Sequence, residues 1–383
     1  MDPPPVGGGG WALLAPGEPE LEEVAEPPEH RIKGSHRGLQ KPVAPTISAV
    51  APTLAIDVGT AMTRVATEAD GLVFAEPTVV AIDTRDGSVV ALGHEAIELV
   101  GRTPRHVVAF RPMHAGATTD FDVAARLLHG VLERCGVGRF SRPRVLLTVP
   151  AAATAIERRA LRQAARRAGA AHAHLLEAPI AAAIGLGLPI HDPVASSVAV
   201  AGAGTTEVAV ISLGGIVSLA SLRVGGDDLD RDIADWIRQR ADAVITSSTA
   251  EALKVSVATA SVEARRRTAE VPARRTSDGA PFVLSVSGDD VHDAIRDHVN
   301  QIVRSSSDCL AEAPPDLAQD VLVHGLHVVG GGSQLDGLHE RLQATIDVPV
   351  NACDAPAEAV VLGAGRCLED LGRLSQLFAS AER

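Results

Sequence analysis

Two short segments combine glycine with hydroxyl side chains in a pattern that suits phosphate binding. IDVGTAMT at residues 56–63 and VAGAGTTE at residues 200–207 each place a glycine-containing turn after an apolar run. Glycine has no Cβ, so backbone N–H groups can approach an anion closely, and threonine hydroxyls add donors. Alone, each segment is more simply explained as a hairpin turn, because short glycine motifs are weak signals. Together they predict a grip on one polyphosphate from two sides, with Asp57 holding Mg²⁺ through waters.

A third glycine loop and one lysine extend this pattern. VVGGGSQ at residues 328–334 precedes a helical segment. Because its glycines have no side chains, the backbone can lie against a base or ribose. A tight strand-to-helix turn is the simpler explanation. Glu251 and Lys254 lie three residues apart on a predicted helix, and Lys254 is the only lysine after residue 50. This spacing predicts a surface ion pair. The motif G-x-x-x-x-G-K-[ST] does not occur in the sequence, which excludes a P-loop enzyme.

The elements that position these loops follow from apolar periodicity. TLAIDVGTAMTRVAT predicts a β-hairpin, GLVFAEPTVVAID one further strand, VVALGHEAIELVG a strand and a short helix, and RVLLTVP a buried strand. FDVAARLLHGVLERCG has helical spacing, and Thr154 with Glu157 predicts a capping box before the next helix. The hairpin pattern restarts at residue 196, followed by predicted helices at about 229–240, 250–257 and 291–310. The fold class is therefore α/β, with a weak internal duplication that favours two lobes facing a cleft.

Composition excludes several function classes. The chain has 383 residues, 46% of them hydrophobic, and a net charge of −13, with 2% aromatic residues and no tyrosine. The acidic balance and the scarcity of stacking side chains argue against a nucleic-acid partner. Four distant cysteines argue against a disulfide scaffold or a zinc site and suit a reducing cytosol. Because we find no membrane span and no secretory signal, we expect a soluble cytoplasmic protein.

Residues 1–50 differ in composition from the rest. They are rich in proline, contain the run Gly7–Gly10, and pass from an acidic stretch to a basic one. Such a segment buries too little apolar surface to offset the entropy of ordering. We predict a disordered N-terminal tail.

Taken in order, these segments resemble a known family. AEPTVVAID, RPRVLLTVP, ERRALRQAARRAGA, APIAAAIGLGLPI, TTEVAVISLGGIV, EALKV and VVGGGSQLDGL are collinear with motifs of the actin-like ATPase superfamily, most closely the MreB-like rod shape-determining proteins. The resemblance spans about residues 53–371. It implies an actin-like ATPase fold with two RNase H-like lobes around a nucleotide cleft. It also implies ATP and Mg²⁺ as ligands, homopolymeric filaments, and partners at the inner membrane surface and among the cell-wall morphogenesis proteins.

The resemblance also implies boundaries and a binding site. Lobe I would occupy residues 51–190 with an insertion at about 84–115, lobe II residues 191–355 with an insertion at about 241–295, and a C-terminal helix at 356–383 would return to lobe I. The implied phosphate contacts are Gly59, Thr60, Ala61, Met62, Thr63, Gly202, Ala203, Gly204 and Thr205. The implied ribose and adenine contacts are Glu251, Lys254, Gly331, Gly332, Ser333 and Gln334, and Asp57 is the implied metal-side carboxylate.

Two departures from the family pattern matter most. Ala178 stands where the family has the glutamate that positions the attacking water, and Val200 stands where it has an aspartate on the second phosphate loop. A methyl group cannot orient water or accept a proton, so the catalytic residue is unknown and the metal site is weakened. Glu177 is adjacent to Ala178, but an extended strand would point it to the other face. Substitution by a neighbouring group is the alternative to reduced hydrolysis.

The family also implies a membrane contact, which matches the loop GVGRFSRPR, where Phe140 is the one large apolar residue. The arginines of the following helix, at 158, 159, 162, 166 and 167, favour a solvated face over a binding patch. A non-polymerising pseudo-ATPase that binds partners through its tail is the second hypothesis. A sugar kinase or chaperone of the same fold fits poorly, because no peptide-binding domain follows.

Overall fold

The computed structural model describes residues 52–102, 104–138, 140–261 and 267–368. The predicted tail at 1–50 and the end of the predicted C-terminal helix, residues 369–383, lie outside these ranges. The described residues belong to one unit, which spans residues 47–383.

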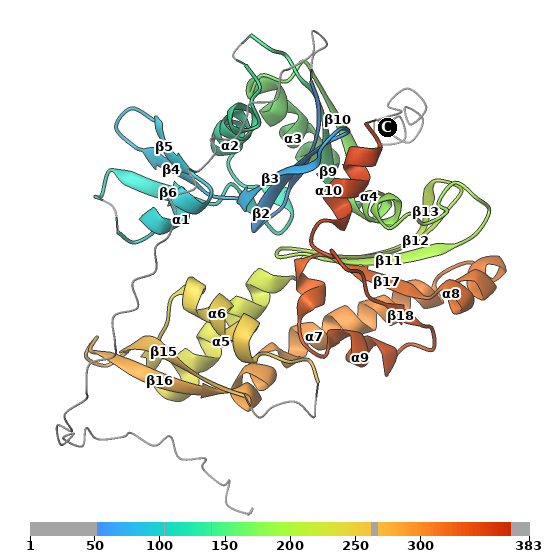
Figure 1. Ribbon diagram of the computed structural model, residues 1–383. Helices are drawn as coiled ribbons and strands as arrows, with labels where there is room; N and C mark the ends of the chain where they lie inside the picture. The colour runs from blue at the N-terminus through green and yellow to red at the C-terminus, as the bar shows by residue number, and fades with distance from the viewer. Residues whose placement is uncertain (1–51, 103, 139, 262–266, 369–383) are drawn as a thin grey trace, which may run out of the picture. The chain divides into compact units, whose positions relative to one another are not determined.

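The first sheet has five strands and begins with the predicted hairpin. Its members are β1 (Thr53–Val58), β2 (Met62–Thr67), β3 (Gly71–Pro77), β9 (Arg144–Val149) and β10 (His172–Glu177), in the order β10-β9-β1-β2-β3 (Figure 1). β1 pairs antiparallel with β2 and parallel with β9, and β9 pairs parallel with β10. The hairpin and the buried strand RVLLTVP are confirmed.

Two helices cover one side of this sheet. α2 (Phe121–Arg134) and α3 (Ala155–Arg167) share a core with β1, β9 and β10, in which Leu127, Leu128 and Leu147 are fully buried. The predicted capping box at the start of α3 is present, because Thr154 accepts from the Glu157 N–H and the Glu157 carboxylate accepts from the Thr154 N–H.

The segment GLVFAEPTVVAID forms two strands, so the single predicted strand is wrong. β3 ends at Pro77, and β4 (Val80–Asp83) belongs to a small sheet of order β5-β4-β6 with β5 (Val89–Leu92) and β6 (Val107–Phe110). Thr78 marks the break: its hydroxyl donates to the Gly59 carbonyl and contacts the Thr63 hydroxyl. Because proline has no N–H to donate and Thr78 bonds to the first glycine turn, the ladder stops here. Beyond it lie α1 (His94–Leu99), β7 (Met113–His114) and β8 (Ala117–Thr118).

The second sheet repeats the topology of the first. β11 (Ser196–Ala201), β12 (Thr206–Ser212), β13 (Gly215–Leu222), β17 (Leu326–Val329) and β18 (Val350–Asn351) have the order β13-β12-β11-β17-β18. β11 pairs antiparallel with β12 and parallel with β17, and β17 pairs parallel with β18. Since each strand matches its counterpart in order and direction, the internal duplication predicted from the two glycine turns is confirmed.

The remaining elements surround the second sheet. The helices are α5 (Gly226–Ala241), α6 (Ser247–Val257), α7 (Gly288–Ala311), α8 (Ala318–His324) and α9 (Leu338–Gln343), with 3₁₀ turns η1 (Pro315–Leu317) and η2 (Gly331–Gln334). A small sheet joins β14 (Ala243–Val244), β15 (Thr268–Arg275) and β16 (Pro281–Ser287). The helices predicted at about 229–240, 250–257 and 291–310 are confirmed as α5, α6 and α7.

Two helices join the sheets. α4 (Ala178–Gly185) and α10 (Ala359–Arg366) share one apolar cluster with residues of both sheets, among them Leu146 and Val198 (Figure 1). Gly363 of α10 lies so close to the carbonyl of Ala181 that a Cβ there would overlap it, so glycine is required for this close approach. The lobe boundaries predicted from the sequence stay predictions. Within the described ranges, no helix has the length and apolarity needed to span a bilayer.

Candidate nucleotide cleft

A cleft of about 170 Å³ lies where the turn between β1 and β2 faces the turn between β11 and β12. Ten of the predicted residues line it: Asp57, Gly59, Thr60, Ala61, Met62, Gly202, Ala203, Gly204, Thr205 and Gly331. The structure therefore brings the predicted phosphate-contacting residues of both lobes together, with the exception of Thr63. That side chain is fully buried and contacts the hydroxyl of Thr78.

The two turns close in the same way. The N–H of Gly59 donates to the carbonyl of Met62 at 3.0 Å, and the N–H of Gly202 donates to the carbonyl of Thr205 at 2.8 Å. Each turn thus satisfies its first N–H internally.

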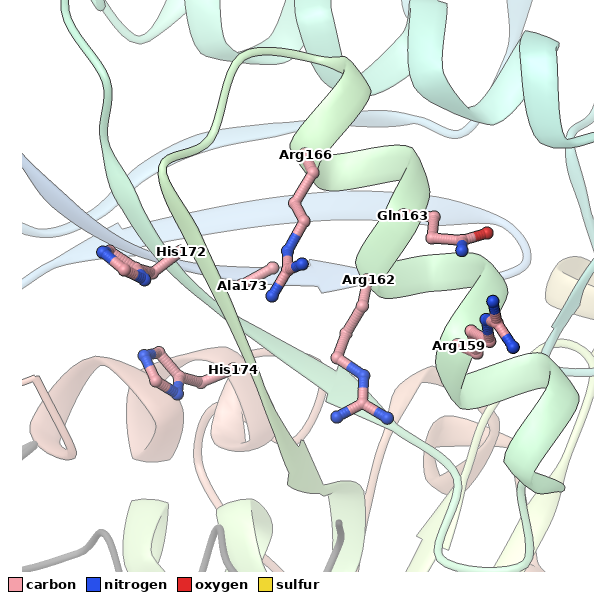
Figure 2. Close-up of a pocket in the computed structure, with 7 residues that line it drawn as sticks. All are labelled: Arg159, Arg162, Gln163, Arg166, His172, Ala173 and His174. Carbon is pink, nitrogen blue, oxygen red and sulfur yellow. The ribbon is translucent and has the colours of Figure 1, made fainter.

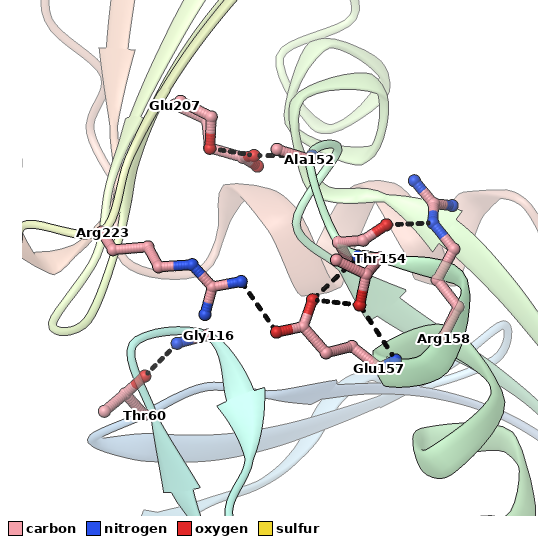
Figure 3. A network of polar contacts seen from close by, with 10 residues as sticks. Thr60, Gly116, Ala152, Thr154, Glu157, Arg158, Glu207 and Arg223 are labelled. Carbon is pink, nitrogen blue, oxygen red and sulfur yellow. Dashed lines mark hydrogen bonds and ion pairs between the residues drawn. The ribbon is translucent and has the colours of Figure 1, made fainter.

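Gly204 allows the closest approach between the turns. A Cβ at this position would overlap the Thr60 hydroxyl and lie 2.9 Å from backbone atoms of Ala115. The Gly116 N–H donates to the same Thr60 hydroxyl at 3.3 Å (Figure 3). Any larger residue at 204 would push the turns apart, because protein interiors have little free volume to absorb a methyl group.

The carboxylates of the cleft differ between its two sides. On the first side, the Thr148 hydroxyl donates to Asp57, and burial raises the pKa of Asp57, against the lowering effects of that hydrogen bond and of Arg64. On the second side, Val200 of β11 lies directly opposite Glu207 of β12, and both line the cleft. Directly opposed residues of antiparallel strands project to the same face. A carboxylate is therefore present beside Val200, on the neighbouring strand.

Glu207 is bound to the other half of the site. Its carboxylate accepts from the N–H groups of Ala151 at 2.9 Å and Ala152 at 3.2 Å, and from the Ser221 hydroxyl at 2.9 Å (Figure 3). The residue is 2% exposed, and burial raises its pKa, although the three hydrogen bonds act in the opposite direction. Because Ala151 and Ala152 follow β9, this carboxylate links the second sheet to the loop that borders the first.

A second link crosses at the surface. Arg223, just beyond β13, pairs with Glu157 of α3 at 2.7 Å (Figure 3). The pair is partly exposed, so its own contribution is small, about 0–1 kcal/mol. Together with Glu207 it connects the second sheet to the loop and helix that follow β9.

Ala178 lines the cleft at the start of α4, and Glu177 faces elsewhere. The Glu177 carboxylate accepts from Arg158 at 2.9 Å, in agreement with the expected opposite orientation. Arg158 was expected on a solvated helix face, and this expectation is wrong, because the side chain is 9% exposed and its guanidinium also donates to the carbonyls of Ala151 and Ala153. Asp57 and Glu207 are the carboxylate side chains among the described residues that line the cleft.

Lys254 does not pair with Glu251, contrary to expectation. Its ammonium group pairs with Asp230 at 2.8 Å and donates to the Gly226 carbonyl at 2.9 Å. Burial raises the pKa of Asp230 to about 6, against the lowering effect of Lys254. The helical spacing of Glu251 and Lys254 permitted a local pair, but α5 packs beside α6 and offers a less exposed carboxylate and a carbonyl at its first turn. Neither Glu251 nor Lys254 lines the cleft.

The first turn of α5 supports the second glycine turn. The N–H of Gly226 donates to the Gly202 carbonyl at 3.1 Å, and that of Asp227 to the Ala203 carbonyl at 2.8 Å. Since Lys254 holds the Gly226 carbonyl, it contacts the second turn indirectly, through α5.

The third glycine loop divides between two depressions. Gly331 lines the cleft, whereas Ser333 and Gln334 line a neighbouring groove of about 270 Å³. The Ser333 hydroxyl donates to the Gly330 carbonyl at 2.7 Å, and Gly332 packs against Ala201. The structure does not bring these residues to the phosphate turns.

Sequence reasoning missed Thr148 and the loop residue Gly116. It also missed the hydrogen-bond partners of Glu207 and Lys254. Thr148 is the one hydroxyl in the strand RVLLTVP, which is a weak signal. The other contacts join residues 14 to 56 positions apart. In the described part of the chain, no group of three or more His, Cys, Asp or Glu side chains is arranged for a metal ion. Phe140 is 95% exposed in the loop between α2 and β9.

Comparison with known proteins decides the family. The model of the MreB/Mbl protein family matches residues 51–376. The chain belongs to the MreB/Mbl family. It is 37% identical over 322 residues to the cell shape-determining protein Mbl of Bacillus subtilis, covering 84% of this chain and 97% of that protein. It is 39% identical over 322 residues to the cell shape-determining protein MreB of Escherichia coli, covering 82% and 93%.

Solved structures agree with this assignment. MreB5 of Spiroplasma citri bound to AMPPNP superposes with a TM-score of 0.79 at 26% identity, covering 86% of this chain and 99% of that one. The MamK double helical filament gives a TM-score of 0.70 at 23% identity, which shows the fold alone. The predicted actin-like ATPase fold is confirmed.

Proposed function

We propose that this MreB/Mbl family member is an ATP-binding cytoskeletal protein that forms filaments in the cytoplasm, organises cell-wall growth, and hydrolyses ATP slowly or not at all. The observation that carries the proposal is the pair of matching glycine turns facing each other across one cleft, with Ala178 and Val200 on its wall. The relative MreB5 of Spiroplasma citri was solved with AMPPNP and with ADP, which supports a nucleotide in this position.

The residues present fit a polyphosphate. A Cβ at Gly204 would overlap the Thr60 hydroxyl, so glycine lets the two turns approach each other, and Thr60 and Thr205 both line the cleft. Both turns would hold phosphate oxygens through backbone N–H groups, as glycine-rich turns do. The proposed contacts for ribose and adenine remain Gly331, Gly332, Ser333, Gln334 and Glu251. Lys254, the sixth residue proposed from the sequence, would support the second turn through α5.

The two sides of the cleft differ in the carboxylates that they offer, and a weakened Mg²⁺ site follows from this difference. Mg²⁺ neutralises phosphate charge when bound and is usually held by one or two carboxylates. Asp57 is suited to this role, because its carboxylate is buried at the first turn with one donor, Thr148. Glu207 already accepts three hydrogen bonds, so it offers the metal little beside Val200.

Slow hydrolysis follows from the lack of a free carboxylate that could position the attacking water. The methyl group of Ala178 cannot orient water, Glu177 is bound to Arg158, and Glu207 is bound to the loop after β9. Phosphoryl transfer depends on positioning and electrostatics, so loss of the positioning carboxylate raises the barrier by several kcal/mol. In this proposal the nucleotide favours closure of the lobes without being consumed quickly.

Nucleotide binding and phosphate release, measured side by side on the purified protein, test the proposal. We expect saturable ATP binding with phosphate release near background. Brisk release on assembly would contradict the slow-hydrolysis part, and absence of binding would contradict the whole.

Filament formation and membrane contact form the outer part of the proposal. The exposed Phe140, with Arg142 in the same loop and Arg144 at the start of β9, suits an apolar insertion flanked by cations that meet anionic lipid. Self-association and cell-wall morphogenesis partners follow from membership in a family of cell shape-determining proteins. The alternative is a non-polymerising scaffold that binds partners through its tail. Light scattering with and without ATP separates the two, because only a polymer scatters more as it assembles.

A further inference from the structure

Few charged side chains line the nucleotide cleft. Asp57 and Glu207 are its carboxylates, and Arg64 is the one cationic side chain among the described residues that line it. Lys254, the cation that the sequence suggested for this site, lies outside the lining. A polyphosphate that enters the cleft therefore meets one positive charge from the described lining, and this charge comes from β2.

The strand register directs Arg64 toward the cleft. Arg64 of β2 lies directly opposite Asp57 of β1, so the two side chains project to the same face of the first sheet. Its partner on β3 is Ala75, which offers no polar side chain. The preceding residue, Thr63, points to the opposite face, where it is fully buried and contacts Thr78.

The half-buried Arg64 side chain has donors to spare. Burial raises the pKa of Asp57, and the charge of Arg64 acts against this rise, but the Asp57 carboxylate accepts its hydrogen bond from Thr148. Within the described part of the chain, the Arg64 guanidinium makes neither a hydrogen bond nor an ion pair. It can therefore bind an anion without first giving up a contact with the protein.

The same surroundings disfavour a metal ion. Mg²⁺ is usually held by one or two carboxylates together with phosphate oxygens of the substrate. Val200 has no carboxylate, and that of Glu207 already accepts three hydrogen bonds, so Asp57 alone would have to hold the ion. Because Arg64 lies directly opposite Asp57, its positive charge repels a second cation at this position.

We propose that Arg64 takes the place of the divalent cation, so that the chain binds the nucleotide polyphosphate without Mg²⁺. The inference rests on the proposed function, because it names the group that neutralises the nucleotide in the same cleft. A guanidinium group matches two phosphate oxygens with paired N–H donors. Since Arg64 is attached to β2, it needs no coordinating group from Val200 or Glu207.

The test measures the affinity of the full chain for AMPPNP by calorimetry, in EDTA and in saturating Mg²⁺. We expect the wild type to have the same Kd in both buffers, within about threefold. Arg64→Met removes the charge and keeps much of the length, so it should bind about tenfold more weakly in EDTA and recover part of this loss in Mg²⁺. Arg64→Lys keeps the charge and should lose less in EDTA than Arg64→Met.

Arg159→Met is the matched control. Arg159 is an exposed residue of α3 and lines a groove of about 470 Å³ beside β10, and no residue of that groove lines the cleft (Figure 2). This variant should bind AMPPNP as the wild type does in both buffers, which would show that loss of an arginine elsewhere has no effect.

Two kinds of failure are distinguishable. If the wild type binds AMPPNP but loses tenfold in EDTA, or if Arg64→Met binds as the wild type does in EDTA, the inference is wrong and the proposed function stands. Equal losses in Arg64→Met and Arg64→Lys, or in Arg64→Met and Arg159→Met, would also overturn the inference, because the charge at this position would not matter. Absence of AMPPNP binding in both buffers would overturn the inference and the proposed function together.

Discussion

The two glycine turns show how one backbone geometry supports different side-chain chemistry. Each closes with the same hydrogen bond, and each joins the first two strands of a sheet with the same strand order. They differ in the cross-strand pair just before the turn, which is Asp57 with Arg64 in the first and Val200 with Glu207 in the second. The backbone of the turn is therefore independent of the carboxylate. In the second turn the carboxylate binds the protein, and in the first it has a single hydroxyl donor.

Restoring the two missing carboxylates should have the largest effect. Ala178→Glu with Val200→Asp is expected to raise phosphate release about 100-fold, and more than either single change, because both groups serve one transition state. Phosphate release at saturating ATP and Mg²⁺ measures this. Ala178→Gln with Val200→Asn is the control, since amides keep the volume but cannot accept a proton. Equal rates in the two double variants would show that hydrolysis is limited elsewhere.

Preventing the close approach of the two turns should have the next largest effect. Gly204→Ala places a methyl group against Thr60 and Ala115, so we expect a loss of about 1–3 kcal/mol in stability and about tenfold weaker ATP binding. Gly138→Ala is the control, because a Cβ there meets nothing within 4 Å and the residue does not line the cleft. Denaturant unfolding and ATP titration of both variants measure the difference. If both alanines have the same effect, the turns do not need to approach closely.

Removing the carboxylate of the second turn should reduce stability. Glu207→Ala leaves the N–H groups of Ala151 and Ala152 without their acceptor, which we expect to cost about 1–3 kcal/mol of unfolding free energy. Ser221→Ala removes only one donor and keeps the carboxylate, so its cost should be about 1 kcal/mol or less. Chemical denaturation measures both. A Glu207→Ala protein as stable as the wild type would mean that the loop after β9 does not depend on this contact.

The carboxylate of the first turn should show a small effect that depends on pH. Burial raises the pKa of Asp57 in the folded state, so the folded protein holds this proton to higher pH than the unfolded chain. Its contribution to stability is therefore present below the unfolded pKa, about 4, and is lost as the pH rises through the folded pKa. Asp57→Asn still accepts from Thr148 and stays neutral, so it should be more stable than the wild type at pH 7 and similar at pH 4.

Asp86 provides a control in which the pH dependence of stability has the opposite sign. The pKa of Asp86 is lowered, chiefly by hydrogen bonds from Ser88, so its contribution is present above the unfolded pKa and lost as the pH falls through the folded one. Asp86→Asn should therefore be less stable than the wild type at pH 7. Thermal melting of both variants at pH 4 and pH 7 measures the two signs. Identical pH profiles for the two variants would contradict the burial of the Asp57 carboxylate.

Local signals predicted most of the fold. The alternation in TLAIDVGTAMTRVAT and the capping box at Thr154 act over a few residues, so the sequence was sufficient for the first hairpin and α3. The collinear motifs predicted the family and the fold, and both are confirmed. The split at Thr78 was missed, because the strand pattern continues through Pro77 and only a bond to the distant Gly59 reveals the break.

Side-chain partners were predicted less well than elements. Helical spacing favoured Glu251 for Lys254, but the partner is Asp230, 24 residues away on another helix. Arg158 was expected in solvent with its neighbours, but it is buried against Glu177, whereas Arg159, Arg166 and Arg167 are exposed as expected. In each case a helix pattern indicates which residues share a face and contains no information on what packs against that face.

The sequence by itself determined the elements, the duplication and the loss of two carboxylates, because these depend on residue type and local spacing. Ala178 and Val200 lack a carboxylate in any conformation. Only the tertiary structure decided that Glu207 lies opposite Val200 and binds the loop after β9, that Glu177 is bound to Arg158, and that Ser333 and Gln334 line a different depression from the phosphate turns. These outcomes depend on how two sheets of the same topology pack around α4 and α10. Packing is decided by contacts between residues that are distant in the sequence, which no local pattern records.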